Sequence, residues 1–421
     1  ISSTTVYVRM TADASGTPVG DITCTAAQAS NKLIAITGSI AEPPSITSPS
    51  SSISNATTCG KNTYAITMAN SASGTWVTSP VNATLIVTSQ GAQNISVNPA
   101  NGLNTDITLT WTENTGACSG YTDQIVIAFN QPDTTFSNAD ENTYLWSGLT
   151  DTEWSTGANW YKWDGNMWVK QTSEPNSSTA KVEISPTDNL CISANNVTNL
   201  TGQIANLNIA NDVIINLGTG AISVNGNIAN EGVINGGNST IEFTATQDQT
   251  ISGSGSTLLN NLTLNKSSGD LIINAPLQLE GTLSMLKGNI NNGLNTLTIG
   301  SSSASTGSIS YASGSVTGKL RRYFAEGSNA SNFFPIGTAS ATRDVTVAFP
   351  TTPGTDQYLT ASYNTGYPQL SATDLYEGLP LTTSDGQLIQ NYDDEGYWEI
   401  NPTSDNYSSS INSTTYNLTI H

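Results

Sequence analysis

Carboxylates and lysines are the side chains that could do chemistry in the middle third of this 421-residue chain. Cleavage of a polysaccharide by a pair of carboxylates needs the two groups roughly 5–10 Å apart. After the first coil of the repeating region the main ionisable residues are few and irregularly spaced: Asp212, Glu231, Glu242, Asp248, Lys266, Asp270, Glu280 and Lys287. No regular spacing would bring two or three carboxylates together on neighbouring repeats, so no catalytic residue is assigned there.

Other catalytic constellations are equally hard to build from this sequence. The single histidine, His421, is the last residue, which leaves no convincing base for a Ser-His-Asp triad or a thiol nucleophile. The glycine-containing stretch GTGAISVNGN lacks a following Lys-Ser or Lys-Thr, so it is not a phosphate-binding loop. We therefore expect no enzymatic activity within these residues, although a catalytic domain elsewhere in a longer parent chain stays open.

Five of the eight tryptophans fall within residues 144–168, which read YLWSGLTDTEWSTGANWYKWDGNMW. Flat aromatic rings stack on sugar faces, which makes Trp154, Trp160, Trp163 and Trp168 candidates for glycan binding. The alternative is that bulky rings cover the open apolar end of a solenoid. The sequence favours this cap over the sugar-binding platform.

The cysteines indicate disulfides rather than a metal site. No two of them have CxxC spacing, and the lone histidine excludes a credible Cys/His zinc site. Cys59 and Cys118 bracket Trp76 and Trp111, which is the arrangement of an immunoglobulin-like core. A Cys59–Cys118 disulfide is predicted, with two free buried thiols as the alternative, and the pairing of the other two cysteines, Cys24 and Cys191, is left open.

Two clusters of charged residues are candidate binding sites. Lys319, Arg321 and Arg322 could bind an acidic polymer, or could form an ion-paired lid where a coil ends; the lid is favoured because alternate strand residues face opposite ways. The second cluster is a carboxylate trio that could hold Ca²⁺, the only candidate cofactor, or could be a solvated turn. Its members are Asp393, Asp394 and Glu395.

The composition predicts an all-β chain. Only 10% of residues are charged, against about 25% in typical domains, and Ser, Thr, Asn and Gly take their place. Thr suits pleated strands, whereas Asn and Gly accept the positive φ of turns. The formal net charge of −20 argues against a nucleic-acid partner. No apolar run approaches the ~18 residues of a membrane span, so none is expected.

Short strand units separated by Asn-Gly, Gly-Gly and Ser-Gly turns recur between residues 181 and 323, and residues 261–285 are typical of them. Each unit is too short for an independent hairpin, but stacking it on the unit one coil earlier would bury its Leu or Ile and let Asn residues hydrogen-bond along the axis. This favours a right-handed parallel β-helix over a series of meanders.

The chain is predicted to hold five segments. A partial immunoglobulin-like module, including a strand in VYVRM, is followed by an immunoglobulin-like β-sandwich, a Trp-rich cap, the parallel β-helix and a C-terminal β-sandwich. Their predicted bounds are 1–42, 43–133, 134–180, 181–323 and 324–421.

Several stretches resemble parts of Bacteroidota secreted cell-surface proteins. TTCGKNTYAIT, GTW and LTWTENTGACSGYTDQIVIAFNQP resemble their polycystic-kidney-disease-like immunoglobulin modules. The WSG…W…NW segment is similar to one that precedes their β-solenoids. LNNLTLNKSSGDLIINAPLQLEGTLSMLKGNINNGLNTLTIG with SGSVTGKLRRYF resembles their β-helical region, and FPIG…RDVTVAF…GYWEINP resembles the module that follows.

This resemblance implies a non-catalytic adhesin or stalk of the gliding-motility kind. Such a protein is exported by the type IX secretion translocon and is secreted or displayed on the cell surface. Its implied contacts are a surface glycan or an abiotic surface. The alternative is a carbohydrate-binding region of a secreted polysaccharide-active enzyme.

Overall fold

β-Strands are the main secondary structure of the described part of the chain. The computed structural model describes residues 5–9, 16–46, 55–59, 64–69, 73–79, 85–87, 94–99, 105–132, 139–187, 191–327, 331–349, 357–366, 381–382, 388–389, 396–402 and 417–421. Within these residues the only helical element is the 3-10 turn Gly157–Asn159, which confirms the all-β prediction. The chain divides into two compact units, Ile1–Gln131 and Pro132–His421. No helix of the described part is long and apolar enough to cross a membrane.

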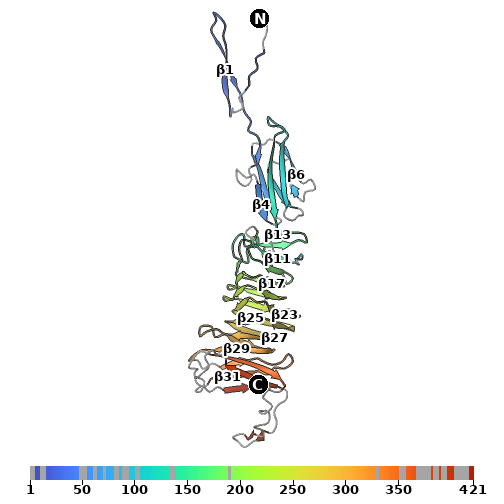
Figure 1. The fold of residues 1–421 in the computed structure, drawn as a ribbon, viewed down its shortest axis with the longest axis vertical. Coiled ribbons are helices and arrows are strands. Elements are labelled where there is room, and N and C mark those ends of the chain that lie inside the picture. Colours follow the sequence, from blue (N-terminus) through green and yellow to red (C-terminus); the bar gives the residue numbers. More distant parts are fainter. Residues whose placement is uncertain are drawn as a thin grey trace. The chain divides into compact units, whose positions relative to one another are not determined.

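The first unit contains a hairpin and two four-stranded sheets (Figure 1). The hairpin is formed by β1 (Val19–Cys24) and β2 (Lys32–Thr37). One sheet has the order β4-β10-β9-β6 and the other β3-β5-β8-β7. Their strands are β3 (Ser45–Ile46), β4 (Asn55–Cys59), β5 (Tyr64–Ala69), β6 (Gly74–Ser79), β7 (Leu85–Val87), β8 (Asn94–Pro99), β9 (Thr105–Glu113) and β10 (Thr122–Asn130). Residues 6–9, part of the predicted strand VYVRM, form no strand.

Alternating residues of these sheets form the core of the first unit. Ile107, Leu109 and Trp111 of β9 are at most 1% exposed. Trp76 on β6 lies opposite Trp111, and their rings meet edge to face with centroids 5.1 Å apart. The two tryptophans between the cysteines therefore do share a core.

The predicted Cys59–Cys118 disulfide is wrong, because Cys118 carries a free thiol. β4 runs parallel to β10, and Cys59 lies opposite Asn130 at the end of β10, whereas Cys118 precedes the start of that strand. The nine residues of β10 span roughly 26 Å, but the Cα atoms of a disulfide lie within about 7 Å. Cys59 and Cys191 are the disulfide-bonded cysteines, and Cys24 is free.

The second unit is built on a parallel β-solenoid of about seven turns, which confirms the predicted β-helix (Figure 1). Each turn adds one strand to each of three parallel stacks. The first stack begins with β11 (Thr143–Trp146), β14 (Lys181–Ile184), β17 (Asn206–Ile209), β20 (Ile228–Asn230) and β23 (Gln249–Ser252). The second holds β15 (Asn196–Thr198), β18 (Ile214–Asn216), β21 (Val233–Asn235), β24 (Ser256–Leu259) and β26 (Leu277–Leu279).

The third stack begins with β16 (Gly202–Ile204), β19 (Ala221–Val224) and β22 (Thr240–Phe243), and it ends at β28 (Ser308–Tyr311). In the later turns, long strands bend round the corners and belong to more than one stack. These are β25 (Asn261–Ile273), β27 (Thr282–Ile299) and β29 (Val316–Phe324).

The period-two pattern of residues 261–285 fills the solenoid interior. Leu262 and Leu264 of β25 lie opposite Leu283 and Met285 of β27, and all four side chains are fully buried. Burying one such side chain contributes about 1.5–3 kcal/mol. Each short strand therefore gains its stability from the turns above and below it rather than from a partner in its own turn.

Asparagine side chains join successive turns on the outside. Asn216 Nδ2 donates to Asn196 Oδ1 at 3.1 Å, and Asn235 Nδ2 donates to Asn216 Oδ1 at 3.0 Å. In the first stack, Asn206 Oδ1 accepts the backbone N–H of Asn227, one turn later, at 2.8 Å. The predicted hydrogen bonding of Asn along the axis is thus present, and we call these contacts the asparagine ladders.

Antiparallel strands lie at both ends of the solenoid. At the first end, β12 (Trp160–Trp163) pairs with β11 and with β13 (Trp168–Lys170). At the other end, β29 pairs with β32 (Gln357–Thr365), which pairs with β35 (Gly396–Pro402). The remaining strands are β30 (Ser331–Phe334), β31 (Val345–Ala348), β36 (Asn417–Ile420), β33 (Leu381–Thr382) and β34 (Leu388–Ile389). Phe334, Val345 and Val347 join the solenoid core, so the C-terminal strands share that core.

Candidate functional site

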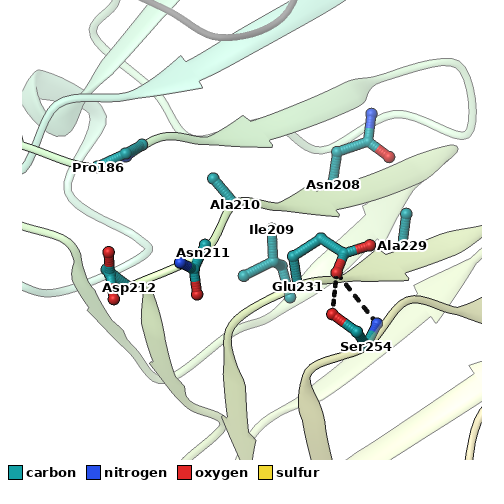
Figure 2. Close-up of a pocket in the computed structure, with 9 residues that line it drawn as sticks. All are labelled: Pro186, Asn208, Ile209, Ala210, Asn211, Asp212, Ala229, Glu231 and Ser254. Carbon is teal, nitrogen blue, oxygen red and sulfur yellow. Dashed lines mark hydrogen bonds between the residues drawn. The ribbon is translucent and has the colours of Figure 1, made fainter.

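A groove of about 830 Å³ lies on the outside of the solenoid, where strands of the first stack end (Figure 2). It crosses successive turns, because its walls come from the ends of β14, β17, β20 and β23. The lining residues are Pro186, Asn208, Ile209, Ala210, Asn211, Asp212, Ala229, Glu231 and Ser254. Small apolar side chains thus alternate with amides and carboxylates along the groove.

Glu231 lies near the middle of this groove and is fixed by the next turn (Figure 2). The Ser254 hydroxyl donates to Glu231 Oε2, and the Ser254 backbone N–H donates to the same oxygen at 3.1 Å. Both hydrogen bonds lower the pKa of Glu231 below its ordinary 4.5, and the bond from the hydroxyl has the larger effect. The carboxylate is therefore ionised at neutral pH and acts as a hydrogen-bond acceptor.

A further carboxyl, that of Glu183 on β14, lies opposite the groove residue Asn208 in the strand register. Asn208 Nδ2 donates to Glu183 Oε1 at 3.0 Å, whereas the buried Oε2 has no hydrogen-bond partner. Burial is the main cause that raises the pKa of Glu183 from 4.5 to about 7. This carboxyl holds a proton near neutral pH, but only 8% of Glu183 is exposed, which keeps it from direct contact with a ligand.

The groove also contains a second carboxylate, that of Asp212. Asp212 lies on the turn after β17 with a φ of 63°, and Figure 2 shows it at the far end of the groove from the Glu231 carboxylate. Asn211 and Ile209 lie between them in that view. The arrangement can accept hydrogen bonds from hydroxyl or amino groups at two separate points.

The tryptophans of the predicted sugar platform are mostly covered. Trp154 and Trp160 are fully buried with Trp146 in the solenoid core, and the Trp160 ring lies 4.6 Å from Trp154 and 5.0 Å from Trp146. Trp168 is 5% exposed and packs edge to face on Trp163. Glycan stacking is therefore wrong for Trp154, Trp160 and Trp168 and stays a prediction for Trp163. Closing the first turn of the core is the role that the cap alternative predicts.

The basic cluster divides between two faces of β29. Arg322 points inward, is 4% exposed, and donates to the carbonyls of Phe333 at 3.0 Å and Gly307 at 3.4 Å. Burial lowers its pKa to about 10. Backbone carbonyls rather than carboxylates thus hold Arg322, so the predicted ion pairing is wrong for this residue. Lys319 is exposed and Arg321 is half-buried.

Lys266 has a structural role that the sequence did not reveal. It is fully buried inside the solenoid, and its Nζ donates to Ala245 O at 2.7 Å, Gln247 O at 2.8 Å and Gln249 Oε1 at 2.9 Å. Burial lowers the pKa of Lys266. A signal was present, because the alternation Leu262, Leu264, Lys266 places this lysine on the inward face of β25.

The predicted calcium ligands Asp393, Asp394 and Glu395 lie outside the described residues. Among the residues that the structure describes, no three His, Cys, Asp or Glu side chains are grouped so that they could hold a metal ion. The calcium site stays a prediction.

Comparison with known proteins adds no relative: no protein-family model, no curated protein and no solved structure matches this chain. Its function must be inferred from its own residues.

Proposed function

We propose that this chain is a non-catalytic stalk segment of a secreted cell-surface adhesin. The observation that carries this proposal is the use of outward polar side chains to bind successive turns to one another, in the asparagine ladders and between Glu231 and Ser254. About seven turns at roughly 4.8 Å each advance the solenoid by about 34 Å. Such a body suits the task of holding other parts of a protein at a fixed distance.

The charged groups of the solenoid favour a structural role. Ser254 holds Glu231 in its ionised form, and three acceptors hold Lys266 in the interior. A general acid or base must instead reach a substrate and have a pKa near the working pH. Glu183 has such a pKa, but its burial keeps it from a substrate.

The proposed location is outside the cell. Cys59 and Cys191 are disulfide-bonded, which suits an oxidising compartment. The resemblance of the sequence to Bacteroidota surface proteins adds export by the type IX secretion translocon and attachment to a glycan or an abiotic surface.

Protease treatment of intact producing cells tests the location. An antibody against the chain should lose its signal on intact cells after treatment, and should find no surface signal in cells that lack the translocon. A signal that resists protease on intact cells but disappears after lysis would place the chain inside the cell and contradict the proposal.

A polysaccharide panel tests the absence of catalysis. The purified chain should release neither reducing ends nor unsaturated ends from neutral or acidic polymers. Release that persists in a Glu231→Gln variant would point to another catalytic group, and release that this variant abolishes would make the groove an active site. Either result would overturn the non-catalytic assignment.

Saccharide binding in the groove is the second candidate function. It is favoured by the position of the ionised Glu231 carboxylate beside the apolar Ala210 and Ala229, a combination that suits hydroxyl donors on an apolar ring. A glycan array should then show signals that Glu231→Gln weakens. Silence of the native chain across neutral and acidic glycans removes this candidate and leaves the stalk role intact.

A further inference from the structure

A second, smaller pocket lies where the parallel solenoid passes into antiparallel strands. Its volume is about 180 Å³, below the ~300–1,000 Å³ that is usual for drug-sized ligands. It lies on the outer face of the sheet formed by β27, β29, β32 and β35. The side chains that matter are Lys319, Arg321, Ser362, Glu399 and Asn401.

Strand register places these side chains in two neighbouring rows. In one row Arg321 lies opposite Thr360, and Thr360 lies opposite Asn401. The adjacent row on the same face contains Lys319 and, on β32 and β35, the pair Ser362 and Glu399. Residues two apart on a strand are roughly 6.6 Å apart, so the Lys319 and Arg321 backbones are neighbours on this face.

Arg321 is oriented but retains free donors. Its Nε donates to Thr298 Oγ1 at 3.1 Å, and its guanidinium carbon lies 4.7 Å from the centroid of the Tyr358 ring. These contacts fix the plane of the guanidinium and leave its two terminal nitrogens without an acceptor among the described residues. A guanidinium held in this way can bind an anionic oxygen pair with little loss of side-chain freedom.

Lys319 adds a second cation that no carboxylate neutralises. It is exposed, and within the described part of the chain it takes part in no salt bridge. The sequence has 12 basic and 32 acidic residues, so two adjacent unpaired cations stand out in a strongly acidic protein. The net charge of −20 does not exclude an anion, because at physiological ionic strength charges beyond about 8 Å are largely screened.

On the opposite side of the pocket, two asparagines hold the Glu399 carboxylate, which is a hydrogen-bond acceptor. Asn401 Nδ2 donates to Glu399 Oε1 at 2.6 Å, and Asn364 Nδ2 lies 3.4 Å from Oε2. β29 and β35 are separated by β32, which places Glu399 roughly 9–10 Å from the Lys319 strand. The Ser362 side chain lies on the strand between them.

We propose that this pocket binds one anionic sugar residue of an acidic polysaccharide. The negative group, a carboxylate or a sulfate ester, lies against Lys319 and Arg321. Hydroxyl groups on the other side of the ring donate to Glu399. The pocket would give the stalk a point of attachment to an acidic matrix, but its binding does not depend on the stalk role.

Binding of defined oligosaccharides to the full chain tests this site. The probes are an oligogalacturonate, a sulfated galactan oligosaccharide and a neutral galactan oligosaccharide, measured by calorimetry at low and physiological salt. We expect one site per chain for the carboxylated probe, the sulfated probe or both, and weaker or no binding of the neutral probe. The two anionic probes separate the possible sources of the negative charge.

The decisive variant is Lys319→Gln with Arg321→Gln. Its matched control is Lys170→Gln with Lys287→Gln, which makes the same change in net charge elsewhere on the second unit. Loss of charge-assisted hydrogen bonds should weaken anionic binding roughly 10-fold or more in the first variant and leave it nearly unchanged in the control. Replacing Arg321 could unfold the region through loss of its contacts. The single variant Lys319→Gln, at an exposed position, keeps those contacts and should still weaken anionic binding.

Three results would overturn the proposal. They are no binding of either anionic probe at millimolar concentration and low salt, equal weakening by the control variant, and equal affinity for the neutral probe. None of these results would bear on surface display or on the absence of catalysis, so failure of this site and failure of the stalk role can be told apart.

Discussion

Glu183 should make the stability of the solenoid depend on pH in an unusual direction. Its folded-state pKa of about 7 lies above the ordinary 4.5 because the carboxyl is buried and one oxygen has no hydrogen-bond partner. The folded chain therefore holds this proton more tightly than the unfolded chain. The stability from Glu183 is complete below pH 4.5 and is lost as pH rises to about 7.

The size of the effect follows from the two pKa values. A difference of about 2.5 between 4.5 and about 7 corresponds to roughly 3 kcal/mol at about 1.36 kcal/mol per pKa unit. Between pH 5 and pH 8 the free energy of unfolding should fall by about 2–3 kcal/mol from this group alone. Glu183→Gln, which cannot ionise, should remove that fall and should be more stable than the native chain at pH 8.

Urea unfolding followed by tryptophan fluorescence measures this effect, because Trp146, Trp154 and Trp160 are buried at the first turns of the solenoid. Native chain, Glu183→Gln and the exposed control Glu141→Gln are compared at the same pH values, so that the titration of all other groups cancels. Parallel pH profiles for the native chain and Glu183→Gln would refute the reasoning.

Three further predictions concern the interior, the turns and the cysteines. Lys266→Met removes the one donor that three acceptors share, of which Gln249 Oε1 is buried, and should lower the free energy of unfolding by about 2 kcal/mol in urea titrations; an unchanged midpoint would contradict the contacts. Gly253→Ala would place a Cβ 2.0 Å from Asn230 O, whereas the Cβ of Gly293→Ala, also at positive φ, would meet nothing within 4 Å. In thermal unfolding, Gly293→Ala should lower the free energy of unfolding by the ~1–2 kcal/mol of left-handed strain, and Gly253→Ala should lower it by much more. Alkylation of the unreduced chain should add two groups, at Cys24 and Cys118, and mass spectrometry that found a modified Cys59 would disagree with the structure.

The solenoid could be predicted because its signal is local. Leu262, Leu264, Leu283 and Met285 alternate with polar residues, and that period of two fixes which side chains face inward. Lys266 follows the same alternation, but lysine is rarely buried without partners. Its partners lie 17 to 21 residues earlier, one turn back, which no local pattern shows.

The disulfide and the groove depend on information that the sequence does not carry locally. Cysteine spacing does not reveal that β4 runs parallel to β10. This direction places Cys59 beside the end of β10, whereas Cys118 precedes its start. The groove is assembled from turns of unequal length, and the contact between Glu231 and Ser254 joins residues 23 positions apart. Only the stacking of the turns brings those groups together.

The antiparallel strands at the two ends of the solenoid also affect how one molecule meets another. A bare parallel turn offers a row of unpaired backbone groups to which the matching turn of a second copy could add, and repetition of that step would build fibres. β12 occupies that position on β11, and β32 occupies it along the second half of β29, in each case with the chain direction reversed. Copies of this chain can thus remain separate molecules at high concentration even though the interior of the solenoid repeats.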